Sequence, residues 1–156
     1  MHWTTHVLTG AAAGYLIERP ALAAAAGVAG HIALDTFPHH DPEGEVPYVL
    51  DSLAGAALLA AMALSRTVRD ADPARASLWG AVAAGLPDLE LLRKLVSPVE
   101  PEEYVFPTHN GTIPHRQTGA LCSGLSQCAL VAALAVPALL KLRRRLPGRN
   151  GPVKPA

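Results

Sequence analysis

The sequence predicts an all-α protein, built as an antiparallel bundle of about five helices that is embedded in a membrane or associated with one. No stretch alternates polar and apolar residues with the period of two that marks a strand, and β-branched residues are sparse. Half of the residues are apolar, but only 4% are aromatic. Charged residues make up 17% of the chain, against about 25% in soluble domains. This shortage of charge indicates either contact with lipid or a large helical core.

Proline, glycine and aspartate divide the chain into five apolar segments that we interpret as helices. In chain order these segments are residues 5–18, 21–36, 48–65, 76–85 and 118–142. Leu86-Pro87-Asp88 must kink or restart the chain, and residues 89–96 are a candidate for a further short helix. We expect residues 1–146 to form one helical domain. Residues 147–156 are rich in proline, glycine and basic residues, and we expect them to form a flexible tail.

Two of the apolar segments are the best candidates for crossing a membrane. Residues 119–140 carry no charge and are long enough for a bilayer, which needs about 20 residues, although Pro137 interrupts them. Residues 48–65 fall slightly short of that length, and the other segments are shorter still. Because alanine drives insertion only weakly, a soluble bundle of alanine-packed helices is the alternative.

The net charge and the cysteine content indicate which partners and which cross-links to expect. The formal net charge is zero, so nothing indicates a nucleic-acid partner. Cys122 and Cys128 fall on different faces of one helix, which argues against a disulfide between them. We interpret both as small residues of the core. The oligomeric state is not indicated by the sequence.

Short connections make successive helices antiparallel neighbours, so the polar residues can be assigned to the two ends of the bundle. Every histidine then lies at one end, together with five acidic residues: Asp35, Asp41, Asp51, Asp88 and Glu90. Most arginines lie at the other end, including Arg66, Arg69, Arg75 and the basic residues that close the last helix. Helices connected at random would scatter these groups, so the histidine end is predicted to be a functional site.

The chemistry of the histidine end favours a divalent transition metal. His31 and Asp35 are four residues apart and present an imidazole and a carboxylate on one helix face. This donor pair suits zinc, with manganese, nickel or iron as alternatives. The candidate metal ligands are His6, His31, Asp35, Asp88 and His109. Asp51 and His115 are second choices, as ligands, as partners that orient a ligand, or as catalytic acid–base groups.

Simpler interpretations exist for several of these residues. Asp51 and Asp88 could each cap a helix. Asp41 and Glu43 could be solvated turn residues, Glu90 could face solvent, and His40 could be exposed beside His39.

Two segments, Thr5-His6-Val7-Leu8-Thr9-Gly10 and Gly85-Leu86-Pro87-Asp88-Leu89-Glu90, resemble motifs of a family of small bacterial inner-membrane-associated metal-dependent hydrolases. Members carry a Thr-His-x-x-x-Gly segment, a Leu-Pro-Asp-x-Asp element and a later histidine element. Residues 30–39 are also similar to the His-x-x-x-Asp helix of zinc-dependent phospholipase C and related nucleases. Here Glu90 replaces the second aspartate, and His109 with His115 only approximates the later element. Trp3 does not lie at an obvious mature terminus, where the trinuclear-zinc relatives use a tryptophan amine.

Residue pattern and resemblance together predict a membrane-associated hydrolase with one or two metal ions that acts on a phosphoester. The resemblance and the site's place beside a bilayer favour a lipid substrate and a bacterial inner membrane. A non-enzymatic membrane protein that binds a metal or a protein partner through the same end is the alternative. A transporter is disfavoured because the acidic residues lie at helix ends. If the helices span, the basic end is cytoplasmic and the histidine end faces outward.

Overall fold

The computed structural model describes residues 1–40, 44–66, 71–95, 97–114 and 118–145, and this part of the chain is helical and contains no strand. The all-α prediction is therefore confirmed. The elements in chain order are α1 (Trp3–Ile17), α2 (Pro20–Thr36), α3 (Glu45–Leu64), α5 (Asp72–Gly85), η1 (Pro87–Leu95), η2 (Pro101–Glu103) and α6 (Ala120–Arg145). η1 and η2 are 3-10 helices. The predicted flexible tail, residues 147–156, lies outside the described residues.

Prolines set several helix boundaries, as the sequence indicates. Pro20 begins α2, and Pro73 lies in the first turn of α5, where a missing N–H breaks no helical hydrogen bond. After Pro87 the chain continues as the 3-10 helix η1 instead of an α-helix. By contrast, α6 runs through Pro137, so the predicted interruption of this segment is wrong. One interior proline removes a single hydrogen bond and bends a long helix without ending it.

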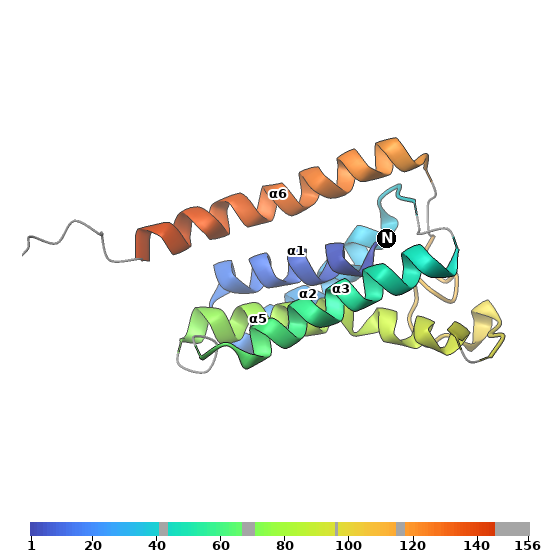
Figure 1. Ribbon diagram of the computed structural model, residues 1–156, viewed down its shortest axis with the longest axis horizontal. Helices are drawn as coiled ribbons and strands as arrows, with labels where there is room; N and C mark the ends of the chain where they lie inside the picture. The colour runs from blue at the N-terminus through green and yellow to red at the C-terminus, as the bar shows by residue number, and fades with distance from the viewer. Residues whose placement is uncertain (41–43, 67–70, 96, 115–117, 146–156) are drawn as a thin grey trace, which may run out of the picture.

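Helix α5 packs against both α1 and α2 through glycine and alanine (Figure 1). A Cβ atom added at Gly10 would lie 2.4 Å from the carbonyl oxygen of Gly80. One added at Gly27 would lie 2.5 Å from the same oxygen. Backbones that approach this closely leave no room for larger side chains at the crossing. The abundance of small residues and the scarcity of aromatic ones follow from this packing.

The C-terminal ends of α1 and α6 are joined by charged groups. Lys141 Nζ and Arg145 Nη2 each lie 2.5 Å from Glu18 Oε1. Lys141 also donates to the carbonyl oxygen of Leu16 at 2.8 Å, which satisfies one of the open carbonyls at the end of α1. These contacts lie at the basic end of α6, opposite the end where α1 begins (Figure 1).

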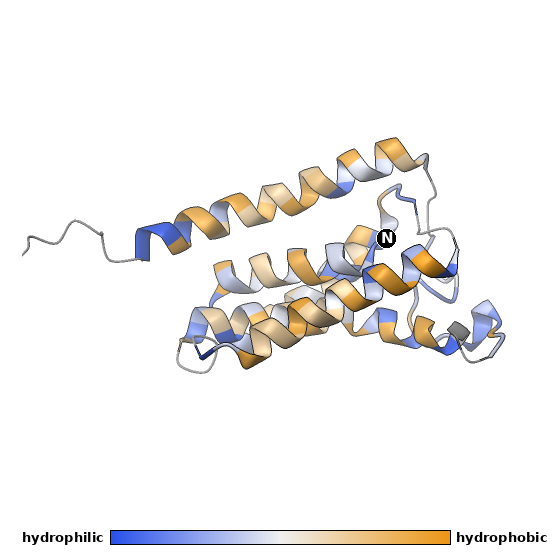
Figure 2. Ribbon diagram, in the orientation of Figure 1, coloured by the Kyte–Doolittle hydropathy of each residue, from blue (hydrophilic) through white to orange (hydrophobic). Residues whose placement is uncertain are grey.

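Two helices, α3 and α6, are long and apolar enough to cross a membrane, and hydrophobic residues make up most of both ribbons (Figure 2). Within α3, Gly55 is the only described residue that is buried. The exposed large apolar residues of α3 are Val46, Val49, Leu50, Leu53 and Leu64. Length and composition alone support membrane association only weakly, because the core helices of soluble proteins pass the same test.

The inward face of α6 is polar near its N-terminal end. Thr5 Oγ1 on α1 donates to Gln127 Oε1 at 2.8 Å, and Gln127 Nε2 donates to Ser123 Oγ at 2.7 Å. Because these two buried residues turn toward the protein, Cys122 and Cys128 face away and are exposed. The interpretation of the cysteines as core residues is therefore wrong, whereas both are free, as expected.

Candidate metal centre

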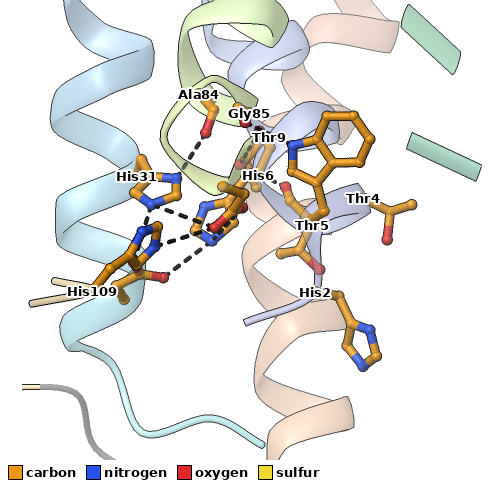
Figure 3. A network of polar contacts seen from close by, with 12 residues as sticks. His2, Thr4, Thr5, His6, Thr9, His31, Ala84, Gly85 and His109 are labelled. Carbon is orange, nitrogen blue, oxygen red and sulfur yellow. Dashed lines mark hydrogen bonds and ion pairs between the residues drawn. The ribbon is translucent and has the colours of Figure 1, made fainter. Parts of the chain in front are cut away.

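Five polar side chains meet where α1 begins and α2 ends (Figure 3). His6 comes from α1, His31 and Asp35 from α2, Asp88 from η1, and His109 from the loop after η2. His6, His31 and Asp35 are buried, and the side chain of His109 is nearly so. The structure thus brings together all five residues that the sequence singles out as ligands, from four separate segments of the chain.

The imidazoles face the two carboxylates through their Nε2 atoms. Asp35 Oδ1 lies 3.1 Å from His6 Nε2, and Asp35 Oδ2 lies 3.1 Å from His31 Nε2. Each of these nitrogens also lies 3.9 Å from an oxygen of Asp88. His109 Nε2 lies 3.3 Å from Asp88 Oδ1 and 3.7 Å from Asp35 Oδ2. Each of the three nitrogens is therefore within 4 Å of both carboxylates.

These atoms are close together, yet several do not hydrogen-bond to one another. Within the described part of the chain, no hydrogen-bond partner exists for the buried atoms His6 Nε2, His31 Nε2, Asp35 Oδ2 and Asp88 Oδ2. Buried polar atoms are normally paired, and an unpaired one costs about 1–3 kcal/mol. A shared cation would satisfy all of them at once.

The distances fit the dimensions of a transition-metal centre. Two ligand atoms that each lie about 2.1 Å from one ion are about 3.0 Å apart at a right angle and about 3.4 Å apart at a tetrahedral angle. The nitrogen–oxygen distances here run from 3.1 to 3.9 Å. Three imidazoles and two carboxylates are also the donor types that zinc and related ions prefer. The residues therefore fit a bound transition ion.

Two of the three imidazoles are fixed through their other ring nitrogen. His31 Nδ1 lies 2.8 Å from the carbonyl oxygen of Ala84, and because a carbonyl only accepts, Nδ1 is the donor (Figure 3). His109 Nδ1 lies 2.7 Å from Glu90 Oε1. Both contacts leave the Nε2 lone pair facing the cluster, which is the usual arrangement of histidines that bind metals.

Glu90 has a role that the sequence did not reveal. Besides contacting His109, its carboxylate accepts hydrogen bonds from the backbone N–H groups of Val105 and Phe106, at 2.9 and 3.0 Å. Its side chain is only 17% exposed, so the interpretation of Glu90 as a solvent-facing residue is wrong. It ties the loop that carries His109 to η1, which carries Asp88. The available signal was a glutamate at the position where the motif that this segment resembles has its second aspartate.

The glycine crossing sets the positions of the helical ligands. His6 lies one turn before Gly10 on α1, and His31 lies one turn after Gly27 on α2. Both glycines contact the backbone of α5 at Gly80. The separation between these two histidines is therefore determined by direct contact of helix backbones.

Burial and neighbouring charges perturb the pKa values of three cluster residues. Burial holds the pKa of His6 below its ordinary value. Burial by itself would raise the pKa of Asp35, but the close imidazoles of His31 and His6 outweigh it and lower that pKa. Burial alone would likewise lower the pKa of His109, but hydrogen bonds to two carboxylates raise it above the ordinary value. An ion that binds His109 would therefore compete with a proton that this imidazole holds more tightly than a free one does.

The second-choice residues lie elsewhere. Asp51, in the second turn of α3, accepts hydrogen bonds from the backbone N–H of Trp3 and from Thr4 Oγ1, each at 2.5 Å. It therefore caps the N-terminus of α1 instead of its own helix. It lines the cavity described next but lies outside the five-residue cluster. His115 lies outside the described residues.

A cavity of about 670 Å³ opens beside the cluster and is partly lined by Asp35, Asp88 and His109. Its volume is in the range of sites that hold drug-sized molecules. Thr108 also lines it, and this side chain is only 3% exposed. Among the residues described, none pairs with Thr108 Oγ1. Its hydroxyl is thus a buried polar atom at the cavity wall that has no partner among the described residues.

The fold and the cluster define an all-helical protein with a histidine–aspartate site of the kind that can hold a divalent transition ion. Comparison of the chain with protein-family models, with curated proteins and with solved structures found no match. The resemblance seen in the short motifs stays a prediction.

Proposed function

We propose that the protein is a membrane-associated, metal-dependent hydrolase of phosphoesters. The single observation that carries this proposal is the convergence of three imidazoles and two carboxylates, several with unpaired buried atoms, at the edge of a large cavity. His6, His31, Asp35, Asp88 and His109 would hold the ion, for which zinc is the first candidate and manganese, nickel or iron are alternatives.

A single ion accounts for the cluster better than two. The ligand atoms form two groups, one of His6, His31 and Asp35 and the other of His31, Asp88 and His109. His31 belongs to both groups, but its Nδ1 is engaged by a carbonyl oxygen, so only Nε2 is left to bind. One imidazole nitrogen binds one ion, so the two groups cannot each hold an ion with a full set of three ligands.

The cavity favours an enzyme over a purely structural metal site. Structural sites are closed by protein ligands, whereas catalytic sites leave room for water and substrate. A zinc ion would keep an open position only if not all five residues bind it at once, whereas a six-coordinate manganese, nickel or iron ion could bind all five and one water. A divalent ion held there would lower the pKa of a coordinated water and polarise a phosphoryl oxygen. Of the chain's own residues, Glu90 would keep His109 oriented, and the Thr108 hydroxyl would donate to a substrate oxygen. Asp51 is engaged by the N-terminus of α1, which favours a positioning role for it over acid–base catalysis.

Membrane association is supported by the distribution of side chains around α3, which has polar residues toward the cavity and apolar residues on its outer face. Its cavity-facing residues include Glu45, Tyr48 and Ser52, while its outward side chains are valine and leucine. A row of exposed apolar side chains is unfavourable in water and favourable against acyl chains. We therefore propose that α3 and α6 place the antiparallel bundle in a bacterial inner membrane. The basic end of α6 would then be cytoplasmic and the histidine end would face outward.

Cysteine labelling tests this orientation. In a protein with Cys122 and Cys128 replaced by alanine, a probe cysteine at Gly44 should react with an impermeant reagent on intact cells. A probe at Arg144, which is exposed at the opposite end, should react only after lysis. The reverse pattern would invert the topology, and protein recovered without any membrane fraction would favour the soluble bundle.

Metal analysis and a generic phosphodiester test the activity. Purified protein should contain about one transition ion per chain, and His31→Ala should lower that content. Hydrolysis of bis-p-nitrophenyl phosphate should be lost in Asp35→Asn, which preserves side-chain size, and retained in Arg75→Ala, which alters an exposed ion pair with Asp72. Folded wild-type protein that takes up no ion would contradict the proposal. An ion without turnover would instead favour a non-enzymatic metal-binding protein.

A further inference from the structure

We propose that the substrate of this site is a phosphoester with an alkyl arm, and that the arm lies along an apolar wall formed by Leu89, Leu91 and Leu92 of η1. The inference rests on the proposed function and adds to it the chemical class of the substrate. It is carried by the size of the cavity, the chemistry of its walls and the sign of its charges.

The size of the cavity calls for a substantial organic group. A volume of about 670 Å³ matches sites that hold drug-sized ligands. A phosphoryl group beside Asp35, Asp88 and His109 would occupy only the part nearest the cluster. The remaining volume must accommodate the group that is esterified to the phosphate.

The wall next to the cluster is apolar. In a 3-10 helix, residues three apart share one edge, so Leu89 and Leu92 lie side by side along η1. Their exposed fractions are 41% and 38%, although both line the cavity. Covering this surface with an alkyl chain removes apolar area from water. Because the ligand residue Asp88 belongs to the same short helix, the wall begins immediately beside the cluster.

The charges of the cavity exclude polyanionic substrates. Its lining includes Glu45, Asp51 and the two aspartates of the cluster, and no lysine or arginine occurs among the lining residues that the structure describes. A nucleoside polyphosphate would bring further negative charges toward these carboxylates. A sugar could find hydrogen-bond partners on the α3 side, where Tyr48 and Ser52 line the cavity, but not along the leucines of η1. A neutral alkyl arm adds no charge and covers those leucines.

The other wall of the cavity is α3, which connects this site to the proposed lipid surface. Tyr48 and Ser52 line the cavity, whereas Val49 and Leu53 are exposed on the same helix. The apolar wall of η1 is thus separated from the proposed acyl region by the thickness of one helix.

Intrinsic fluorescence gives a binding readout that is independent of turnover. The chain has two tryptophans, of which Trp3 lines the cavity and Trp79 is exposed on α5. In a Trp79→Phe background, ion-loaded protein would be titrated with octylphosphonate and methylphosphonate at one fixed detergent concentration. Each buried methylene contributes about fourfold to affinity. Octylphosphonate should therefore bind at least about tenfold more tightly than methylphosphonate, even if only part of the chain is buried.

Variants of the wall locate the effect. Leu92→Gln should reduce the preference for the octyl ligand to about threefold or less, because an amide replaces part of the apolar surface. Leu86→Gln is the matched control, since Leu86 is exposed, lies just before η1 and does not line the cavity. It should retain the full preference. Equal loss in both variants, or equal affinity of the wild type for both phosphonates, would overturn the inference.

Turnover separates the inference from the function on which it rests. Methyl and octyl p-nitrophenyl phosphate share a leaving group, so a higher kcat/KM for the octyl ester supports the alkyl site. Equal kcat/KM values would refute the alkyl site and leave metal-dependent hydrolysis standing. Tighter octylphosphonate binding without hydrolysis of either ester would refute the hydrolase and support the alkyl site. Release of product from phosphatidylglycerol vesicles would identify the source as a bilayer lipid, whereas turnover of the octyl ester alone would identify a soluble alkyl phosphoester.

Discussion

Replacing Glu90 with glutamine tests whether the loop that carries His109 is held by one carboxylate. Glu90 Oε1 contacts His109 Nδ1 at 2.7 Å and accepts from the N–H of Phe106 at 3.0 Å, while Oε2 accepts from the N–H of Val105 at 2.9 Å. Glutamine keeps the size of the side chain but has one acceptor oxygen instead of two. Its NH2 group must therefore face a donor, and at least one of these hydrogen bonds is lost.

The size of the effect follows from the environment of the carboxylate. A hydrogen bond to a charged group contributes about 1.5–3 kcal/mol, and at 17% exposure Glu90 keeps much of that value. Loss of an outer partner of a metal-binding histidine typically lowers metal affinity by about 10–100-fold. That range corresponds to about 1.4–2.7 kcal/mol. We expect Glu90→Gln to weaken zinc binding by about 10–100-fold.

Competition with a chromophoric chelator at neutral pH measures this affinity directly. Glu103→Gln is the matched control, because Glu103 pairs with Arg93 on the surface and its side chain is 52% exposed. Exposed pairs contribute little, so this variant should bind zinc within about threefold of wild type. Unchanged zinc affinity in Glu90→Gln, with helicity preserved in both variants, would show that the carboxylate does not support the site.

Three further predictions concern protonation, substrate contact and packing. Because the pKa of His109 is raised in the ion-free protein, this protein keeps a proton on His109 to higher pH. Zinc affinity should therefore rise with pH until the pH passes the pKa of His109. Zinc affinity that is flat between about pH 5.5 and 8.5 would contradict this prediction. Thr108→Val should raise KM for a phosphodiester about tenfold without loss of ion, and Thr108→Ser should restore it. Gly80→Val should lower the free energy of unfolding by about 3 kcal/mol in denaturant titrations, because its Cβ would lie 2.3 Å from the Gly10 carbonyl oxygen. Gly124→Val is the control and should lower it far less, because a Cβ at Gly124 meets nothing within 4 Å.

The residues of the cluster could be predicted because their positions follow mainly from the order and the alternating direction of the helices. Short connections force neighbouring helices to alternate in direction, so residues near the start of one helix and the end of the next reach the same end. His6 and His31 follow from this rule alone. Asp88 and His109 follow because the chain returns to that end after α5. The helix boundaries were predictable for the same reason, since proline and glycine punctuate the sequence.

The remaining features depend on contacts between segments that lie far apart in the sequence. The sequence of one such segment does not reveal its partner. Asp51 looks like a cap for its own helix, but its partners are N–H groups of α1, which lie nearly fifty positions earlier in the chain. The inward face of α6 was not predictable because small apolar residues surround the whole helix. The hydrogen bond from Thr5 to Gln127 and the one from the backbone N–H of His40 to Ser123 identify these two residues as the buried pair.

The contact of α1 and α2 with α5 at Gly80 also bears on which ions the site can accept. Calcium requires six to eight oxygen ligands at about 2.3–2.6 Å, a larger sphere than the one that zinc occupies. An ion of zinc's size needs ligands that lie close together, and Gly10 and Gly27 allow α1 and α2 to approach α5 backbone to backbone. In the proposed site, the close approach of His6 and His31 would therefore depend on glycines that do not belong to the ligand set. A methyl group added at Gly10 or Gly27 would push the helices outward, and we expect it to favour a larger ion with every ligand intact.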